Sequence, residues 1–378
     1  MSFNQYTWDL YKQTTIGIEM IKYFSDAGGY VLFKDYCPYA NFIPEDLYND
    51  WLENIYCYGV SDYDHPSSLE EAKDLYISLI TLGIRVEGQQ WLPANDFKNM
   101  LGIIQPMSYA LSQFAPEYFF PYLFLCRIFE LNKIADFFNI DLPNIPKRTD
   151  YKGRCMYYWE LCEVFYLFRK ENGLSPADLW SFLYDFAPNN LPSEKIDMPK
   201  PSQVWFIGGR LYQEDKSLES KFWQSSPETK KGDILVHYET SPISAITCIE
   251  ISLTDGVIDP LFRYYGCIYI GNRINIPHIT LKELQTDEYF FKHPLVRKNF
   301  QGVNGWSVNS ENYSELLRMI KTKGFDIEVL PKLYAPTLPK DVIIEYEHDV
   351  EQQLLEPLLN SMGWYENKDF IRQLPIQA

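Results

Sequence analysis

The sequence predicts a multidomain α+β protein with a mostly helical N-terminal domain, a central small β-barrel with short helices, and a C-terminal helical segment. Its 378 residues are enough for two or three domains. Apolar residues recur at helical spacing through the first half, and from residue 203 the pattern changes to short apolar runs typical of strands. Hydrophobic residues make up 46% of the chain, which supports a packed core.

Helices are predicted throughout residues 1–190. Ile16–Phe24, Leu69–Leu82 and Met156–Phe168 each carry apolar side chains at positions that share one face of a helix. Because no motif marks this domain, the sequence assigns it no role.

One helix start is marked by several residues at once. Ser175 is a suitable N-cap, Pro176 suits the first helical position, and Asp178 completes a capping box with its charge at the positive end of the helix dipole. This helix is expected to run to about Phe186 and to stop near Pro188, since proline interrupts a helix.

Proline-rich stretches separate the predicted domains. The expected organisation is a helical domain at 1–190, a linker at 191–202, the barrel domain at 203–325, a second linker at 326–340, and a last segment at 341–378. Within the barrel domain the strands expected are Val204–Ile207, Asp233–Tyr238, Ile243–Ile251 and Tyr265–Ile270. Short helices are expected at 280–284 and 310–320. Short strands with few helices over this length indicate a small barrel.

Charge and cysteine content exclude some classes of protein. The net charge of −17 argues against a protein that coats DNA, although residues 200–325 are nearly neutral, with 15 Lys and Arg against 14 Asp and Glu. The seven cysteines form no C-x2-C pair, so buried free thiols are expected rather than a zinc site or a disulfide framework. The chain shows no signal peptide and no apolar run long enough to span a bilayer, so a soluble cytoplasmic protein without a membrane partner is expected.

Several segments of the barrel domain follow one another in a recognisable order. They are Trp205 followed by Gly208-Gly209-Arg210, then Phe222-Trp223, Lys230–Tyr238, Glu239–Pro242, Leu295–Gly302 and Trp306–Val308. In this order they resemble the EVE family, relatives of the YTH and PUA-like domains, over about 120 residues. The resemblance implies a PUA-like barrel that holds a nucleobase, often a modified one, in an aromatic pocket.

The residue types suit this chemistry, because aromatic faces stack on a base and polar groups select its edge. The candidate base-binding residues are Trp205, Trp223, Tyr238, Trp306, Ser241, Arg210 and Asn304. The candidate phosphate-binding residues are Arg263, Arg297 and Lys298. Structural alternatives stay open: Trp205 is as suited to a core as to a pocket, and Trp306 could simply begin a strand. No catalytic residues, cofactor or metal are expected in this domain.

The last segment has apolar residues at 350, 354, 355, 358 and 359, which predicts an amphipathic helix that Gly363 would cap. Together with Asp349-Val350 and Gly363-Trp364 it resembles the opening helix of the nuclease domain in type I restriction motor subunits. That family holds its metal with a later Asp and a later E-x-K. Because the sequence ends at Ala378, the domain is expected to be truncated, and Mg²⁺ is expected only for a complete one.

Three functions follow as hypotheses. The first is a recognition module of a prokaryotic restriction or anti-phage protein, whose partners are DNA or RNA with a modified base and other defence-system subunits. The second is the regulatory half of a metal-dependent endonuclease whose catalytic core lies beyond residue 378. The third is a structural or interaction protein whose barrel takes no ligand. No P-loop, catalytic triad or H-E-x-x-H motif is visible, so this chain is not expected to be catalytic by itself.

Overall fold

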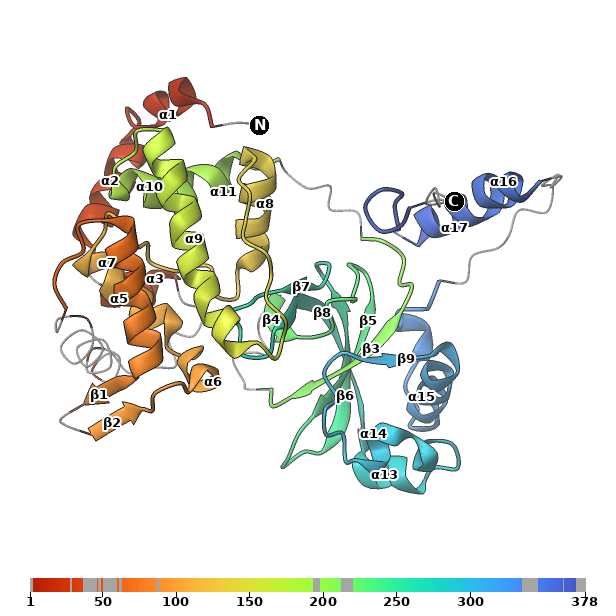
Figure 1. Cartoon of the computed structure of the whole chain (residues 1–378). Helices are drawn as coiled ribbons and strands as arrows, with labels where there is room; N and C mark the ends of the chain where they lie inside the picture. Colours follow the sequence, from red (N-terminus) through yellow and green to blue (C-terminus); the bar gives the residue numbers. More distant parts are fainter. Residues whose placement is uncertain are drawn as a thin grey trace, which may run out of the picture. The chain divides into compact units, whose positions relative to one another are not determined.

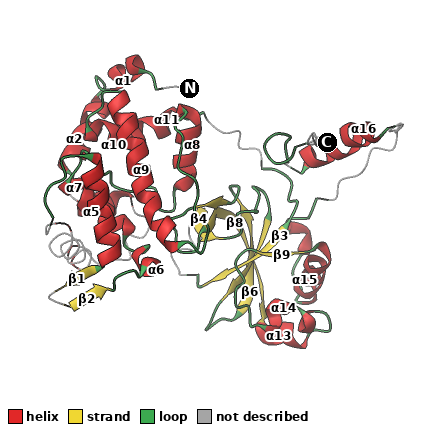
Figure 2. Cartoon of the chain, in the orientation of Figure 1, coloured by secondary structure: helices red, strands yellow, loops and turns green. Residues whose placement is uncertain are grey.

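The structure is a computed structural model and contains two compact units (Figure 1). It describes residues 3–27, 29–36, 46, 49, 60, 63–86, 89–192, 198–211, 220–334, 346–362 and 364–371. The first unit comprises Met1–Glu194 with Ile258–Tyr265, and the second comprises Lys195–Val257 with Gly266–Ala378. Helices dominate the first unit and a curled sheet the second, so the protein belongs to the α+β class, as predicted (Figure 2).

The first unit is built from helices and one small hairpin. Its helices are α1 (Gln5–Tyr11), α2 (Thr15–Asp26), α3 (Gly29–Tyr36), α5 (Leu69–Leu82), α6 (Phe97–Met100), α7 (Ile104–Phe114), α8 (Ile128–Phe138), α9 (Tyr151–Glu171), α10 (Pro176–Ser181) and α11 (Ala187–Asn190). The hairpin pairs β1 (Ile84–Val86) with β2 (Gln89–Leu92). The helix expected at Ile16–Phe24 lies within α2, and that at Met156–Phe168 lies within α9.

The long helix α9 supplies much of the core of the first unit. Tyr158 and Trp159 are fully buried, and Tyr158 donates its hydroxyl to the carbonyl of Phe120 at 2.7 Å. Tyr76 of α5 packs on both rings and donates to the carbonyl of Cys155 at 2.6 Å. Large aromatic side chains with satisfied hydroxyls therefore hold α5 and α9 together.

The capping box before α10 is confirmed, with reciprocal hydrogen bonds between Ser175 and Asp178. The helix passes through a π-helical turn at Phe182–Phe186, continues as α11 and ends at Asn190, close to the expected stop near Pro188. Proline has no backbone N–H to continue a helix, and only two residues of α11 follow Pro188.

Arg154 of α9 anchors the segment 258–265 to the first unit. Its buried guanidinium donates to the carbonyls of Pro260 at 2.8 Å and Phe262 at 2.7 Å. Within the same segment, Tyr265 donates to the carbonyl of Pro146 at 2.6 Å. A stretch that the sequence assigns to the barrel domain is thus part of the helical unit.

The second unit contains a curled seven-stranded sheet with the strand order β4-β8-β6-β5-β3-β9, and with β7 paired to β8. The strands are β3 (Val204–Gly209), β4 (Ser220–Gln224), β5 (Ile234–Glu239), β6 (Ala245–Ser252), β7 (Val257–Ile258), β8 (Gly266–Thr280) and β9 (Trp306–Val308). The expected strands are all present, although β8 is much longer than expected and β4 was not predicted. Strands β3 and β5 are parallel, and the other pairs along this path are antiparallel.

Two hydrophobic clusters lie on the two faces of this sheet. The larger involves Ile234, Val236 and Tyr238 of β5 with the helices α13 (Leu281–Thr286), α14 (Pro294–Arg297) and α15 (Ser310–Thr322). The smaller contains Leu235 of β5 with Trp205 and other side chains, and Trp223 packs against it. This division follows from the alternation of side chains along a strand. Short 3₁₀ turns lie at Phe290–Lys292 and Ile327–Val329.

The C-terminal segment forms α16 (Glu347–Val350), a π-helical turn at Glu351–Leu355, and α17 (Glu356–Ser361), as the apolar spacing predicts. Gly363 lies outside the described residues. The carboxylate of Asp369 forms an ion pair with the ammonium group of Lys230 at 2.5 Å. The same ammonium group lies 4.8 Å from the ring centroid of Trp364. These contacts tie the end of the chain to the turn before β5.

Among the described residues, no helix combines the length and the apolar character needed to cross a membrane. Free, buried thiols are confirmed for Cys155, Cys162 and Cys248, and Cys126 and Cys267 are buried as well. Cys37 and Cys57 lie outside the described residues.

Candidate functional site

The candidate site begins where the parallel strands β3 and β5 end, because their carboxyl ends lie at the same edge of the sheet. Asn304 clamps the end of β3: its Oδ1 accepts from the N–H of Gly208 at 2.8 Å, and its Nδ2 donates to the carbonyl of Gly208 at 2.9 Å. Nδ2 also lies 3.3 Å from Oε1 of Gln224 in β4. Arg210 donates to the carbonyl of Ser241, the residue two beyond β5, at 3.1 Å. The polar side chains of Arg210 and Asn304 thus lie at the ends of these strands.

Trp223 of β4 lies against this edge. A Cβ atom added at Gly209 would stand 2.6 Å from Cζ2 of Trp223, so the indole ring lies directly against the glycine backbone. The ammonium of Lys221 lies 4.8 Å from the Trp223 ring centroid, and the His237 ring lies at the same centroid distance. Trp223 is half-buried, yet its Nε1 is inaccessible to solvent and has no hydrogen-bond partner in the described chain.

Glu250 joins Lys221, His237 and Arg273 into one polar cluster. Nδ1 of His237 lies 2.9 Å from Oε2 of Glu250. Oε1 of Glu250 accepts from Arg273 Nε at 2.9 Å and lies 3.5 Å from the ammonium of Lys221. Burial would raise the pKa of Glu250, but the hydrogen bond from His237 and the charges of Lys221 and Arg273 outweigh it and hold that pKa well below its usual range.

For the pKa of His237, the effect of burial outweighs that of the neighbouring charge. Its side chain is fully buried, and burial lowers its pKa more than the neighbouring carboxylate of Glu250 raises it. The imidazole is therefore neutral near pH 7, and its Nε2 has no hydrogen-bond partner in the described chain. Nε1 of Trp8, Trp159 and Trp180 in the first unit is likewise buried without a partner in the described chain.

Cys248 adds a third potential metal ligand to His237 and Glu250, since one donor atom of each lies within 4.8 Å of the others. Two features oppose a metal ion there. Burial raises the pKa of Cys248 to about 12, whereas a metal requires the thiolate. Arg273 and Lys221 already contact Oε1 of Glu250, and their positive charges would repel a cation. The arrangement fits an ion-pair network better than a metal site.

The predicted base-binding residues separate into groups. Trp223, Asn304, Arg210 and Ser241 lie at the edge described above. Trp205 is a core residue, buried in the smaller cluster, and its Nε1 donates to Asp233 at 2.8 Å. The predicted convergence of Trp223, Tyr238 and Trp306 on one slot is not found.

Tyr238 and Trp306 belong to the larger cluster instead. Tyr238 stacks on Phe300 with ring centroids 4.0 Å apart and an interplanar angle of 2°. Trp306 begins β9 opposite Phe206 and packs against the same cluster. Both are on the helix-covered side of the sheet, because Tyr238 follows Ile234 and Val236 in the alternation of β5.

The predicted phosphate-binding residues are all exposed. Arg263 belongs to the first unit, whereas Arg297 ends α14 and Lys298 follows it in the second unit.

Sequence reasoning missed Lys221, Glu250 and Arg273. Glu250 could have been noticed because it is a charged residue inside the mostly apolar run Ile246–Ile251. A strand that is buried on both faces normally carries apolar side chains throughout. Lys221 and Arg273 gave no such signal, because β4 was not predicted and Arg273 was placed beyond the end of its strand.

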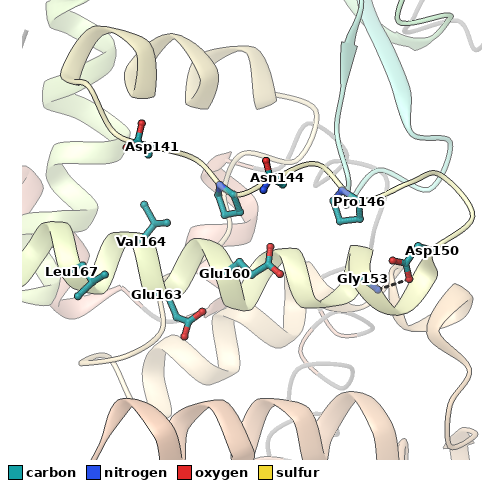
Figure 3. Close-up of a pocket in the computed structure, with 10 residues that line it drawn as sticks. Asp141, Asn144, Pro146, Asp150, Gly153, Glu160, Glu163, Val164 and Leu167 are labelled. Carbon is teal, nitrogen blue, oxygen red and sulfur yellow. Dashed lines mark hydrogen bonds between the residues drawn. The ribbon is translucent and has the colours of Figure 1, made fainter.

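A separate hollow of about 490 Å³ lies in the first unit beside α9 (Figure 3). Glu160 and Glu163 come from α9, while Asp141 and Asn144 come from the segment that runs alongside it. Burial, and then the charge of Glu163, raise the pKa of Glu160. The acidic lining would repel a phosphate, so this hollow is not part of the predicted nucleic-acid site.

No family model matches the chain. A search of curated proteins also finds no match. Two solved structures are weakly similar: Rpa0253 from Rhodopseudomonas palustris, solved by NMR, and a hypothetical protein from Leishmania major. The first is 14% identical, with 32% of this chain and 94% of that chain covered, and the second is 12% identical, with 33% and 98% covered. Both TM-scores are 0.28, and we draw nothing about fold or function from them.

Proposed function

We propose that the second unit is an EVE-type, PUA-like domain that binds a nucleobase, and that the base contacts Trp223. The observation that carries the proposal is the state of this indole. It is half-buried, it lies against the backbone of Gly209, and its buried N–H has no partner in the described chain. A buried indole donor without a partner suits a planar heterocycle whose edge carries hydrogen-bond acceptors.

The surroundings of Trp223 support the same ligand. Asn304 and Arg210 offer amide and guanidinium groups at the adjoining strand ends, and Arg210 is exposed. The near neutrality of residues 200–325 removes the repulsion that the rest of the chain would exert on phosphate. The proposal therefore keeps four of the predicted base-binding residues, namely Arg210, Trp223, Ser241 and Asn304. It assigns no contact with the base to Trp205, Tyr238 or Trp306.

Titration calorimetry at low salt tests this function. The probes are single-stranded and double-stranded oligonucleotides with unmodified cytosine or adenine, 5-methylcytosine, 5-hydroxymethylcytosine or N6-methyladenine. Trp223→Ala should weaken binding by about 5- to 150-fold, because a buried acceptor of the base left without its donor costs about 1–3 kcal/mol. Trp364→Ala is the matched control, since Trp364 contacts Lys230 in the same unit. Failure of the wild-type protein to bind any of these probes would refute the proposal.

The wider setting is also a proposal. The resemblance of the C-terminal segment to restriction nucleases supports a recognition module of a restriction or anti-phage protein, working on DNA or RNA. Loss of protection against phage when the Trp223→Ala gene replaces the natural one would support the defence role.

A further inference from the structure

Two buried nitrogen atoms in the second unit lack hydrogen-bond partners in the described chain and belong to neighbouring rings. They are Nε1 of Trp223 and Nε2 of His237, and the centroids of the two rings are 4.8 Å apart with an interplanar angle of 59°. Indole Nε1 is always a donor, whereas an imidazole nitrogen donates or accepts according to its tautomer. The tautomer of His237 therefore decides what a ligand must offer.

The contact with Glu250 fixes that tautomer. The charges of Arg273 and Lys221 keep Glu250 ionised, so its carboxylate only accepts hydrogen bonds. Nδ1 of His237, at 2.9 Å from that carboxylate, must then carry the proton. Because the buried imidazole is neutral, Nε2 is left with a lone pair and acts as an acceptor. The two free nitrogens thus form one donor and one acceptor.

We infer that His237 determines specificity by accepting an N–H donor of the ligand at Nε2, while Nε1 of Trp223 donates to a neighbouring acceptor on the same edge of the base. This inference rests on the proposed function and narrows its substrate class. The ligand is a neutral heterocycle with an N–H group beside an acceptor, such as the amino group and ring nitrogen of cytosine or adenine. A heterocycle whose edge is fully alkylated is excluded.

Matched pairs of small bases test the inference directly, because each pair differs by one N–H donor. The pairs are 1-methylcytosine with 1-methylpyrimidin-2-one, 9-methyladenine with 9-methylpurine, and 1-methyluracil with 1,3-dimethyluracil. The wild-type protein should bind the donor-bearing member of its preferred pair about tenfold to a hundredfold more tightly, since losing the donor leaves a buried acceptor unpaired. A ratio near one in every pair that binds would overturn the inference.

Two substitutions distinguish recognition from a structural role of His237. His237→Asn keeps a donor for Glu250 near the position of Nδ1 but has no group at the position of Nε2. His237→Gln places an amide oxygen near Nε2 and gives up the contact with Glu250. If His237 recognises the base, the affinity ratio within the preferred pair should fall to near one in His237→Asn. The His237→Gln variant should keep most of that ratio. A purely structural role predicts that the Asn variant keeps the wild-type ratio, and this result would overturn the inference.

The outcomes also separate the inference from the proposed function. If the wild-type protein binds none of the bases and no oligonucleotide, the proposed function fails and the inference falls with it. If it binds without discrimination within the pairs, only the role of His237 fails. Thermal unfolding of each variant establishes that it is folded. If neither variant folds, the affinity ratios that the wild-type protein shows within the matched pairs decide whether His237 accepts an N–H donor.

Discussion

Asp233 forms a G-D motif with Gly232 and directly precedes β5. Its carboxylate connects the residues before β3 to the turn before β5. The side chain is buried and accepts four hydrogen bonds. Oδ1 accepts from the hydroxyl of Ser202 at 3.2 Å and the N–H of Gln203 at 3.1 Å. Oδ2 accepts from Nε1 of Trp205 at 2.8 Å and the N–H of Lys230 at 2.8 Å. One carboxylate thus joins β3, the turn before β5 and the indole of Trp205.

Asp233→Asn replaces one of the two oxygens by an NH2 group while preserving size and shape. With the NH2 group at the position of Oδ1, the hydroxyl of Ser202 can turn to accept from it, and only the N–H of Gln203 faces a donor. An unsatisfied buried donor costs about 1–3 kcal/mol, so the free energy of unfolding of the second unit should fall by about 1–3 kcal/mol. The mutated chain is expected to fold, since the hydrophobic clusters on both faces of the sheet are unchanged.

Urea denaturation followed by tryptophan fluorescence at pH 7 measures this loss. Asp326→Asn is the matched control, because Asp326 is exposed and caps a single 3₁₀ turn through the N–H of Glu328. Asparagine caps as well as aspartate, so the control should change the free energy of unfolding by only a few tenths of a kcal/mol. A loss below about 0.5 kcal/mol for Asp233→Asn would show that the four contacts are not the reason for the G-D motif, since it lies under the cost of a single unpaired donor.

Three further changes have distinct expected outcomes. Gly209→Ala should displace the Trp223 ring and weaken base binding about as much as Trp223→Ala, because the new Cβ would lie 2.6 Å from Cζ2; calorimetry with the same probes measures it. Burial raises the pKa of Asp259 from 3.8 to about 7, so the folded first unit binds more protons than the unfolded chain and its free energy of unfolding falls as pH rises from about 4 to 7. Asp259→Asn should remove this pH dependence and be more stable than wild type by about 3 kcal/mol more at pH 8 than at pH 4, measured by urea denaturation. Arg154→Met should lower the free energy of unfolding of the first unit by about 2–4 kcal/mol, since it leaves backbone carbonyls of 258–265 without donors; the same denaturation series measures it.

The elements that the sequence predicts well are those whose local signals agree with their packing. Ser175 and Asp178 form the expected capping box because cap residues act through hydrogen bonds to the nearest turn. The strands β3 and β5 are buried on both faces and were recognised as continuous runs. In both cases the deciding interactions lie within a few residues of one another.

Strands β4 and β8 could not be delimited in the same way. Phe222 and Trp223 of β4 were read only as an aromatic region, because a strand of five residues gains its stability from the β8 residues it pairs with. Gly271 and Asn272 read as a turn, yet β8 continues through them with Asn272 at φ 52° and an irregular register opposite β6. A bulge and a turn share the same residue types, and only long-range pairing distinguishes them.

The candidate site was predicted in part for a related reason. Residue type indicates that an aromatic ring can stack, but the face of the sheet on which it lies depends on register. Tyr238 and His237 are neighbours in sequence and lie on opposite faces of β5, so the tyrosine joined the core while the histidine reached Trp223. Asn304 and Arg210 lie beside strand ends, where the sheet does not fully bury their side chains, and their part in binding stays a prediction.

The buried cluster around Glu250 is difficult to explain by stability alone. Replacing a buried ionic group by well-packed hydrocarbon is often neutral or stabilising, so Lys221, His237, Glu250 and Arg273 are a weak source of folding free energy. The ion pairs satisfy Glu250, but they leave Nε2 of His237 unpaired at a position that an apolar side chain would fill without that penalty. The proposed ligand would complete this network by donating to Nε2 of His237, which has no partner in the described chain.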